Sequence, residues 1–181
     1  MYQLPQLHTE RLTLRRIEVE DMASLIKHAN NPKIADQIFN IDYPYTEENA
    51  IERLNFVFQA LKKENRYVFA IADTHNNELI GEIGIHLDEG NKAEMGYWLS
   101  EDYWGKGLMT EAIGAALQFG FNEVGLNKIF ATHFLENPAS GKAMKKNGMI
   151  KEAELKDHYF YNGMYKSVVQ YRLTKAEYEA L

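Results

Sequence analysis

The sequence contains no cysteine among its 181 residues. Without thiols, the chain has no disulfide framework, no thiolate nucleophile and no cysteine-bound zinc. Its six histidines do not cluster at the spacing of metal ligands. His133 and Glu136 are close in sequence, but they are expected at a strand end and in a loop. We therefore expect no metal site and no catalysis through a cysteine nucleophile.

Long apolar runs and an excess of basic charge are also missing. No stretch approaches the roughly 20 apolar residues that a membrane-spanning helix needs. Residues 1–5 lack the basic start and apolar segment of a secretory signal. The formal net charge is −6, which argues against general nucleic-acid binding. Lys142, Lys145 and Lys146 lie on one predicted helix face, where a solvated face is the simpler interpretation. We expect a cytoplasmic protein that binds neither membrane nor nucleic acid.

Length and composition favour one folded unit. With 181 residues, of which 45% are hydrophobic, the chain can bury a substantial core. No internal repeat or linker-like stretch divides it. We expect residues 1–181 to form a single domain.

The spacing of apolar residues predicts a mixture of helices and strands. Strands are predicted over residues 11–16, 66–73, 78–86, 92–100 and 127–132, and as a pair around Asn162-Gly163 within 150–173. Helices are predicted over residues 18–30, from the cap residue Thr46 onward, from the turn near 107 to about 123, and from Pro138 to about 147. A helix between two strands lets them lie parallel. We expect a mixed α/β sheet flanked by helices, with a ligand cleft beside the turn near 107.

The most informative stretch covers residues 97–111 and leads from a predicted strand through a polar turn into a helix. Gly105 and Gly107 flank Lys106 there. Glycines let backbone N–H groups point outward together, and a helix start adds free N–H groups and a positive dipole end. That combination binds phosphate, although an ordinary glycine-containing turn is the competing interpretation. A P-loop would need Ser or Thr where Leu108 stands, and two glycines are too few for a dinucleotide fingerprint.

Residues 104–109, Trp-Gly-Lys-Gly-Leu-Met, resemble the acyl-CoA pyrophosphate loop of the GNAT family of N-acetyltransferases, Gln/Arg-x-x-Gly-x-Gly/Ala. Gly107 matches the central glycine, whereas Trp104 and Met109 depart from the pattern. Further segments resemble the RimJ/RimL-like branch of that family in the same order along the chain: residues 9–15, 79–85, 93–99, 137–140, 147–149 and 161–165. Because these matches span almost the whole chain, it is identified as a member of that branch.

The resemblance implies a GNAT-like acyl-CoA N-acyltransferase fold, with a mostly antiparallel central sheet and one parallel, splayed strand pair. It implies direct acetyl transfer from acetyl-CoA, the co-substrate, to a primary amine, with no metal and no covalent intermediate. Loop N–H groups and Lys106 would bind the pyrophosphate, and the strand backbone would pair with the pantetheine arm. Asn137 would orient that arm or simply cap a helix. The expected cofactor-binding residues are Tyr97, Trp98, Leu99, Trp104, Gly105, Lys106, Gly107, Leu108, Met109, Thr110, Asn137 and Ser140.

The expected catalytic residues are Glu94 and Ser140. Glu94 stands where several family members carry a glutamate that takes the proton of the amine. A solvated strand residue is the competing interpretation, and Glu82 is the second candidate for the base. Ser140 would serve the leaving thiolate, or it would cap a helix N-terminus. Met144 replaces the tyrosine acid of many members, and Tyr159 replaces a glutamate base of RimL-like proteins, which leaves that role to another residue or to solvent.

The fold itself does not name the amine acceptor. The leading hypothesis is a protein or peptide N-terminus, such as that of a ribosomal protein. A polyamine or small-molecule amine is the alternative, since residues 157–165 resemble spermidine acetyltransferases. Residues 39–45 and this aromatic-rich tail are expected to form the acceptor pocket. A non-catalytic acyl-CoA-binding module is favoured only by Met144, and a domain for another nucleotide is a third possibility. The resemblance is also compatible with a homodimer.

Overall fold

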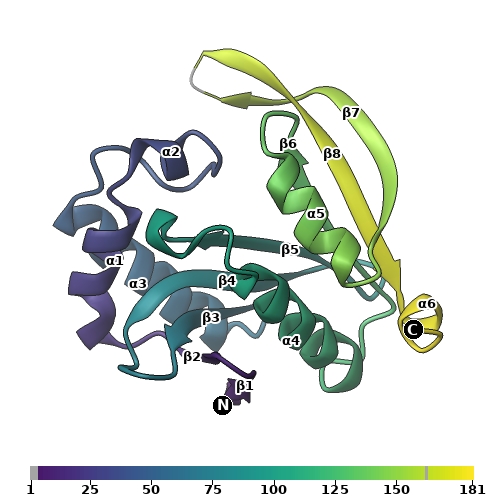
Figure 1. Ribbon diagram of the computed structural model, residues 1–181, viewed down its shortest axis with the longest axis horizontal. Helices are drawn as coiled ribbons and strands as arrows, with labels where there is room; N and C mark the ends of the chain where they lie inside the picture. The colour runs from purple at the N-terminus through teal and green to yellow at the C-terminus, as the bar shows by residue number, and fades with distance from the viewer. Residues whose placement is uncertain (1–3, 162) are drawn as a thin grey trace.

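The computed structural model describes residues 4–161 and 163–181. Its strands form one eight-stranded sheet in the order β1-β2-β3-β4-β5-β6-β8-β7 (Figure 1). All neighbouring strands are antiparallel except β5 and β6, which are parallel. The strands are β1 (Leu7–His8), β2 (Leu12–Arg16), β3 (Arg66–Asp73), β4 (Leu79–Asp88), β5 (Lys92–Leu99), β6 (Lys128–Phe134), β7 (Ile150–Tyr161) and β8 (Met164–Thr174). The predicted mixed α/β sheet is confirmed.

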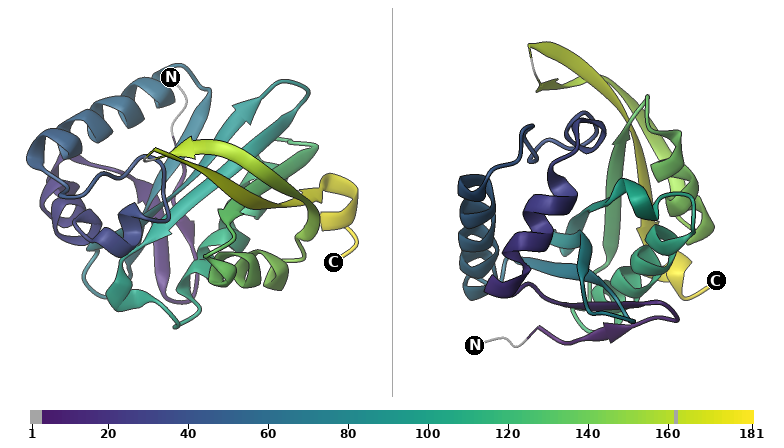
Figure 2. Two further views of the ribbon diagram at one scale, coloured as in Figure 1. Left: turned by 90° about the horizontal axis from the view of Figure 1, so that it is seen from above. Right: turned by 60° about the vertical axis from the view of Figure 1, so that its left-hand side comes forward.

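Helices cover both faces of this sheet (Figure 2). They are α1 (Met22–Ala29), α2 (Pro32–Ala35), α3 (Glu47–Lys62), α4 (Leu108–Asn122), α5 (Pro138–Lys146) and α6 (Lys175–Tyr178), with single 3-10 turns η1 (Val19–Asp21) and η2 (Glu101–Tyr103). Helices α1 and α3 pack on one face, where Leu25, Leu54 and Trp98 belong to one core. Helix α4 packs on the opposite face, where Phe69 and Phe119 belong to a larger core.

Short-range signals in the sequence explain where several helices begin. Thr46 and Asn49 form a reciprocal capping box at the start of α3, as predicted. The helix predicted over residues 18–30 instead opens with the 3-10 turn η1 before α1. The carboxylate of Asp21 at this turn accepts two hydrogen bonds from the Arg15 guanidinium, each 2.8 Å long, which tie the turn to β2.

The remaining differences lie in very short elements. Strand β1 has two residues, and α2 and α6 have four each; none is predicted from the sequence, because segments this short show no hydrophobic period. At the predicted turn between β7 and β8, Gly163 has φ of +76°, the left-handed conformation that such turns use. The Asn162 half of that turn prediction lies outside the described residues.

The parallel strand pair is brief, and its separation opens the sheet. Strands β5 and β6 pair only from Lys92 opposite Lys128 to Glu94 opposite Phe130. Beyond that point, residues 95–99 of β5 remain paired with β4 but have no partner in β6. Helix α4 begins shortly after β5 ends, so an open strand edge lies beside a helix N-terminus. None of the described helices combines the length and apolarity that crossing a membrane would require.

Candidate active site

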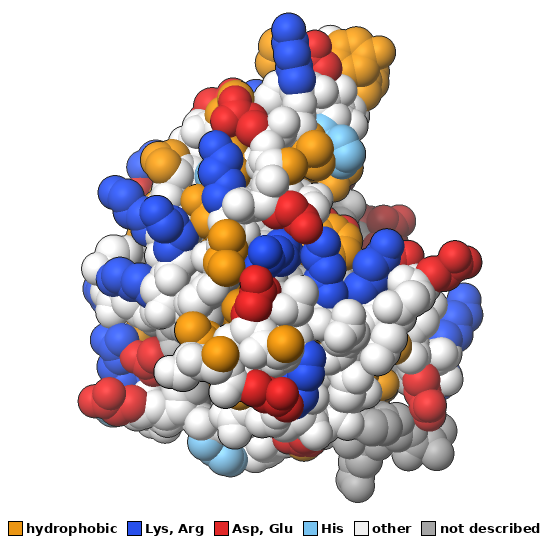
Figure 3. Space-filling model, turned by 90° about the vertical axis from the view of Figure 1, so that its right-hand side faces the viewer, with side chains coloured by type: hydrophobic (Ala, Val, Ile, Leu, Met, Phe, Trp, Pro, Cys, Tyr) orange, Lys and Arg blue, Asp and Glu red, His pale blue; other side chains and the backbone are white. Residues whose placement is uncertain are grey.

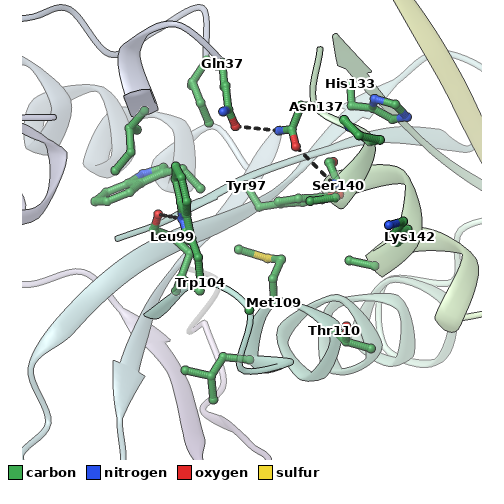
Figure 4. A pocket seen from close by; sticks show the side chains of 18 of the residues that line it. Gln37, Tyr97, Leu99, Trp104, Met109, Thr110, His133, Asn137, Ser140 and Lys142 are labelled. Atoms are coloured by element: carbon green, nitrogen blue, oxygen red, sulfur yellow. Dashed lines mark hydrogen bonds between the residues drawn. The ribbon is translucent and has the colours of Figure 1, made fainter. Parts of the chain in front are cut away.

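A cleft of about 510 Å³ opens where β5 and β6 separate (Figure 4). Its walls come from β5, the turn before α4, the first turns of α4 and α5, and the segment around α2. All predicted cofactor-binding residues except Lys106 line it. The volume is that of a typical small-molecule site. The fold therefore brings together the cofactor-binding residues predicted from the sequence, and their individual roles remain predictions.

The turn before α4 presents free backbone donors to the cleft. Gly105 and Gly107 have φ of +72° and +79°, and Gly107 is the N-cap of α4. This left-handed backbone strains any residue with a Cβ. The N–H groups of residues 105–109 donate to no residue in the described ranges, whereas Thr110 and Glu111 donate to the Gly107 carbonyl. Five consecutive free N–H groups at a helix start suit an anion.

Arg11, the residue before β2, links this turn to the first turn of α4 through hydrogen bonds. Its Nη1 donates to the Lys106 carbonyl at 3.0 Å, and its Nε donates to Glu111 Oε1 at 2.6 Å. Glu111 also accepts from the Thr9 hydroxyl at 2.9 Å. Burial raises the pKa of Glu111, but these hydrogen bonds outweigh it and lower the pKa overall. Arg11 is not among the residues predicted from the sequence for this site, and the only sequence signal for it is the match of residues 9–15 to the family.

The side chains of two predicted loop residues, Lys106 and Trp104, form hydrogen bonds with the protein backbone. The Lys106 ammonium donates to the Asp102 carbonyl at 2.8 Å and lies over the Tyr103 ring. Trp104, which replaces the usual Gln or Arg, donates from Nε1 to the Leu99 carbonyl at 2.7 Å. The tryptophan therefore ties the turn to the end of β5 and occupies a carbonyl at the open strand edge.

The most prominent pair of polar side chains in the cleft is Tyr97 and Ser140. The two hydroxyl oxygens are 2.7 Å apart, although the residues come from β5 and α5 (Figure 4). Burial raises the pKa of the Tyr97 phenol, and the hydrogen bond to Ser140 offsets this only in part. The phenol is therefore neutral at pH 7 and keeps a proton with which it can donate a hydrogen bond. From the sequence, only the backbone of Tyr97 is expected to bind the cofactor, and no local pattern points to its side chain.

Asn137 rather than Ser140 caps α5. Its Oδ1 accepts from the Ser140 backbone N–H at 3.3 Å, and its Nδ2 donates to Gln37 Oε1 at 2.8 Å. The capping interpretation of Asn137 is thus confirmed and that of Ser140 is wrong, because the Ser140 hydroxyl is directed to Tyr97. Met144 is fully buried in the core, so it supplies packing and no proton.

The two candidate carboxylates have different surroundings. Glu82 is 3% exposed, and it accepts from Arg53 at 2.7 Å and from Trp98 Nε1 at 3.0 Å. Glu94 is half-buried and lies opposite His86 in the sheet. Burial raises the pKa of Glu94, with Arg66 as the main opposing charge. Glu94 does not line the cleft, so a base at this position would act through water.

Basic charge at the cleft comes from α5. Lys142 and Lys146 both line it and are exposed, as expected of a solvated helix face. On the face seen in Figure 3, basic side chains are interspersed with acidic ones. Within the described ranges, no group of three or more His, Asp or Glu residues could hold a metal ion.

The two segments predicted to form the acceptor pocket do meet. The Phe39 ring lies 4.4 Å from that of Tyr159 and 5.2 Å from that of Tyr161, between ring centroids. A second cavity of about 90 Å³ lies next to the cleft and includes Tyr45 in its lining. Tyr97 lines both cavities.

Comparison with known proteins shows the family. The model of the acetyltransferase (GNAT) domain matches residues 11–150, and the chain belongs to this family. An uncharacterized N-acetyltransferase, p20, from Bacillus licheniformis is 33% identical, over 95% of this chain and 97% of that protein. A Bacillus subtilis (strain 168) protein provisionally named as a ribosomal N-acetyltransferase, YdaF, is 28% identical over 94% of both chains. The protein is therefore an N-acetyltransferase.

Solved structures share the fold over nearly the full length. A GNAT-family acetyltransferase from Bacillus anthracis has a TM-score of 0.85 at 26% identity, covering 95% of this chain and 99% of that one. Spermidine N-acetyltransferase from Vibrio cholerae, in complex with CoA and spermine, has a TM-score of 0.80 at 25% identity, covering 94% and 99%. A RimL ribosomal-protein acetyltransferase in complex with coenzyme A has a TM-score of 0.85 at 19% identity, covering 94% and 98%.

Proposed function

We propose that this N-acetyltransferase takes acetyl-CoA as its co-substrate and acetylates the α-amine of a protein or peptide, such as the N-terminus of a ribosomal protein. The observation that carries the proposal is the convergence of three features in one cleft. These are the free N–H groups of residues 105–109, the open edge of β5 over residues 95–99, and the paired hydroxyls of Tyr97 and Ser140.

The pyrophosphate and the pantetheine arm of acetyl-CoA each have a matching surface. The N–H groups of residues 105–109 bind the pyrophosphate, and Lys142 and Lys146 add positive charge at the rim. The pantetheine amides pair with the open edge of β5 as an added strand would. Because Trp104 already occupies the Leu99 carbonyl, that pairing is expected nearer to Tyr97.

The chemistry follows from the hydroxyl pair. The amine nitrogen attacks the thioester carbonyl carbon and the C–S bond breaks. The CoA thiolate takes a proton from the Ser140 hydroxyl, which takes the proton of Tyr97 in turn, and solvent then reprotonates the Tyr97 phenolate. The proton that the amine loses passes through water to Glu94 or directly to solvent. Tyr97 then serves as the acid in place of the tyrosine that many family members carry at the position of the buried Met144.

We extend the proposal to the domain organisation. The family match ends at residue 150, but β8 pairs with β6 and β7 pairs with β8, so the later residues belong to the same sheet. Residues 1–181 are therefore proposed to form one acetyltransferase domain. A cytoplasmic location and a homodimer remain predictions from the sequence and the family resemblance.

Two other candidates each have one observation in their favour. The likeness to a spermidine N-acetyltransferase supports a polyamine acceptor. The replacement of the usual tyrosine by the buried Met144 supports a non-catalytic acyl-CoA-binding module. Release of the CoA thiol distinguishes the binding module from an enzyme, because a binding module does not cleave the thioester.

The test is release of CoA thiol from acetyl-CoA with a panel of amines: peptides with free and with blocked N-termini, spermidine, and small alkylamines. We expect thiol release with free-N-terminus peptides and none above background with blocked ones. Best activity with spermidine would replace the peptide acceptor by the polyamine. Stabilisation by CoA without thiol release from any amine would establish the binding module instead.

A further inference from the structure

The second cavity, beyond Tyr97 from the cofactor cleft, has in its largely apolar lining three charged or titratable side chains to which the proposed acetyl transfer gives no role. Arg53 reaches it from α3, and Glu82 and His86 reach it from β4. Gly96, Tyr97 and Trp98 line both the cavity and the cleft. A group that extends away from the reacting amine can therefore enter it.

The charged groups of this cavity are already paired with each other. Arg53 Nη2 is 2.7 Å from Glu82 Oε2, and the same oxygen accepts from Trp98 Nε1 at 3.0 Å. Burial raises the pKa of Tyr45 to about 12, so its phenol is neutral. Glu82 is the only carboxylate in the lining, and its charge is balanced by Arg53. A second ammonium group of a polyamine would find no unpaired carboxylate among these residues.

Arg66 determines which nitrogen of His86 carries the proton. Arg66 Nη1 lies 3.1 Å from His86 Nδ1, and a guanidinium can only donate, so Nδ1 accepts. Burial, with Arg66 and Arg53, lowers the pKa of His86 to about 4, so the ring is neutral at pH 7. The single ring proton is then on Nε2, an assignment that follows from the hydrogen-bond network.

The Nε2–H group of His86 has no acceptor among the described residues, and His86 lines the cavity. Nε2 makes no hydrogen bond to any residue of the described ranges, and a Cβ built on Gly84 would lie only 2.7 Å from it. Gly84 and His86 both line the cavity. The missing side chain at Gly84 thus leaves room for the imidazole at the lining of the cavity.

We propose that this cavity binds the carbonyl group next to the reacting α-amine, with His86 Nε2–H as hydrogen-bond donor. The inference rests on the acetyl transfer proposed above and adds a specificity residue to it. The cavity, at about 90 Å³, is much smaller than the cleft, at about 510 Å³. The cavity therefore accepts an amide or peptide carbonyl and excludes a long cationic chain. It favours peptide-type amines over polyamines.

The experiment compares two acceptors of similar size, alaninamide and sec-butylamine, of which only the first has a carbonyl beside its amine. Thiol release gives kcat/KM for wild type, His86→Leu and His86→Gln, and each variant is referred to wild type with the same amine. His75→Leu is the matched control, because His75 is 85% exposed in its side chain. The KM for acetyl-CoA reports whether the cofactor cleft is intact.

We expect His86→Leu to lower kcat/KM about tenfold for alaninamide, the worth of one hydrogen bond, and to leave sec-butylamine and the KM for acetyl-CoA unchanged. His86→Gln, which keeps an N–H donor, should recover part of the loss. An equal loss with both amines would overturn the inference, as would a wild-type preference for spermidine over alaninamide, a comparison that needs no variant to fold. No thiol release with any amine would instead refute the acetyl transfer on which the inference rests.

Discussion

At the scale of single residues, the cleft depends on side chains whose partners come from distant parts of the sequence. The hydroxyls of Tyr97 and Ser140 are 43 residues apart in the chain and 2.7 Å apart in space. The raised pKa of Tyr97 keeps its proton in place at neutral pH. A neutral phenol next to a serine hydroxyl is suited to protonate a departing thiolate.

Tyr97→Phe removes the phenol oxygen with little change in shape. We expect kcat to fall by about 10²-fold, the lower range for a general acid, while the KM for acetyl-CoA changes little. Ser140→Ala should have a similar effect, and the double variant should lose little more, because the two hydroxyls act as one unit. Steady-state thiol release measures this. Fully additive losses would show that the hydroxyls act separately, and an unchanged kcat in both single variants would remove them from the mechanism.

Glu94 gives a prediction about pH. A base works only when deprotonated, so kcat should fall as the pH decreases through the pKa of Glu94, which burial raises. Glu94→Gln should lower kcat and remove that acid limb from the profile of kcat against pH. If the variant keeps both kcat and the acid limb, water or another group accepts the proton.

Glu82→Gln is the comparison variant. It leaves the Arg53 guanidinium, which is 21% exposed in its side chain, without its carboxylate. We expect it to lower the melting temperature more than Glu94→Gln does, because removing one member of a buried ion pair leaves an uncompensated charge.

At the scale of elements, the turn into α4 combines a left-handed backbone with a run of free N–H groups over residues 105–109. The φ of Gly107 is +79°, and a Cβ added there would have Arg11 Nη2, at 3.5 Å, as its one neighbour within 4 Å among the described residues. A side chain at Gly107 would therefore strain the backbone and stand where a phosphate has to approach.

Gly107→Val should raise the KM for acetyl-CoA at least tenfold, as expected for the loss of one charge-assisted hydrogen bond. Gly90→Val is the matched control, because Gly90 has a similar φ of +76° and an added Cβ would meet no described residue within 4 Å, but it lies in the β4–β5 turn. Both variants should lose stability through the strained backbone, and only Gly107→Val should lose affinity. Equal KM values for the two would disprove the pyrophosphate assignment.

At the scale of the whole molecule, ligand binding to the folded state raises the melting temperature. A ligand at 100 times its dissociation constant contributes about 2.7 kcal/mol, which corresponds to a shift of roughly 5–10 °C for a chain of this size. We expect such a shift with acetyl-CoA and with CoA, and none with ATP at the same concentration. A comparable shift with ATP would favour a general nucleotide site, and no shift with any ligand would mean that Trp104 and Met109 have abolished cofactor binding.

The sequence by itself determined the order of the main helices and strands and the glycine-containing turn. These features depend on hydrophobic periods, caps and turn residues that act over a few positions, so a single chain displays them directly. Asn137 as the cap of α5 is an example: its partner Ser140 is three residues away.

Only the tertiary structure decided how the side chains of the site are paired. Arg11 donates a hydrogen bond to Glu111, 100 residues away in the chain, and Arg53 forms an ion pair with Glu82. The Ser140 hydroxyl is hydrogen-bonded to Tyr97 and does not cap α5. These contacts depend on where β5 and β6 separate and on how α3 and α5 pack against the sheet. No local pattern encodes that geometry, because a hydrogen bond between distant residues forms only after strand register and helix packing have fixed both partners.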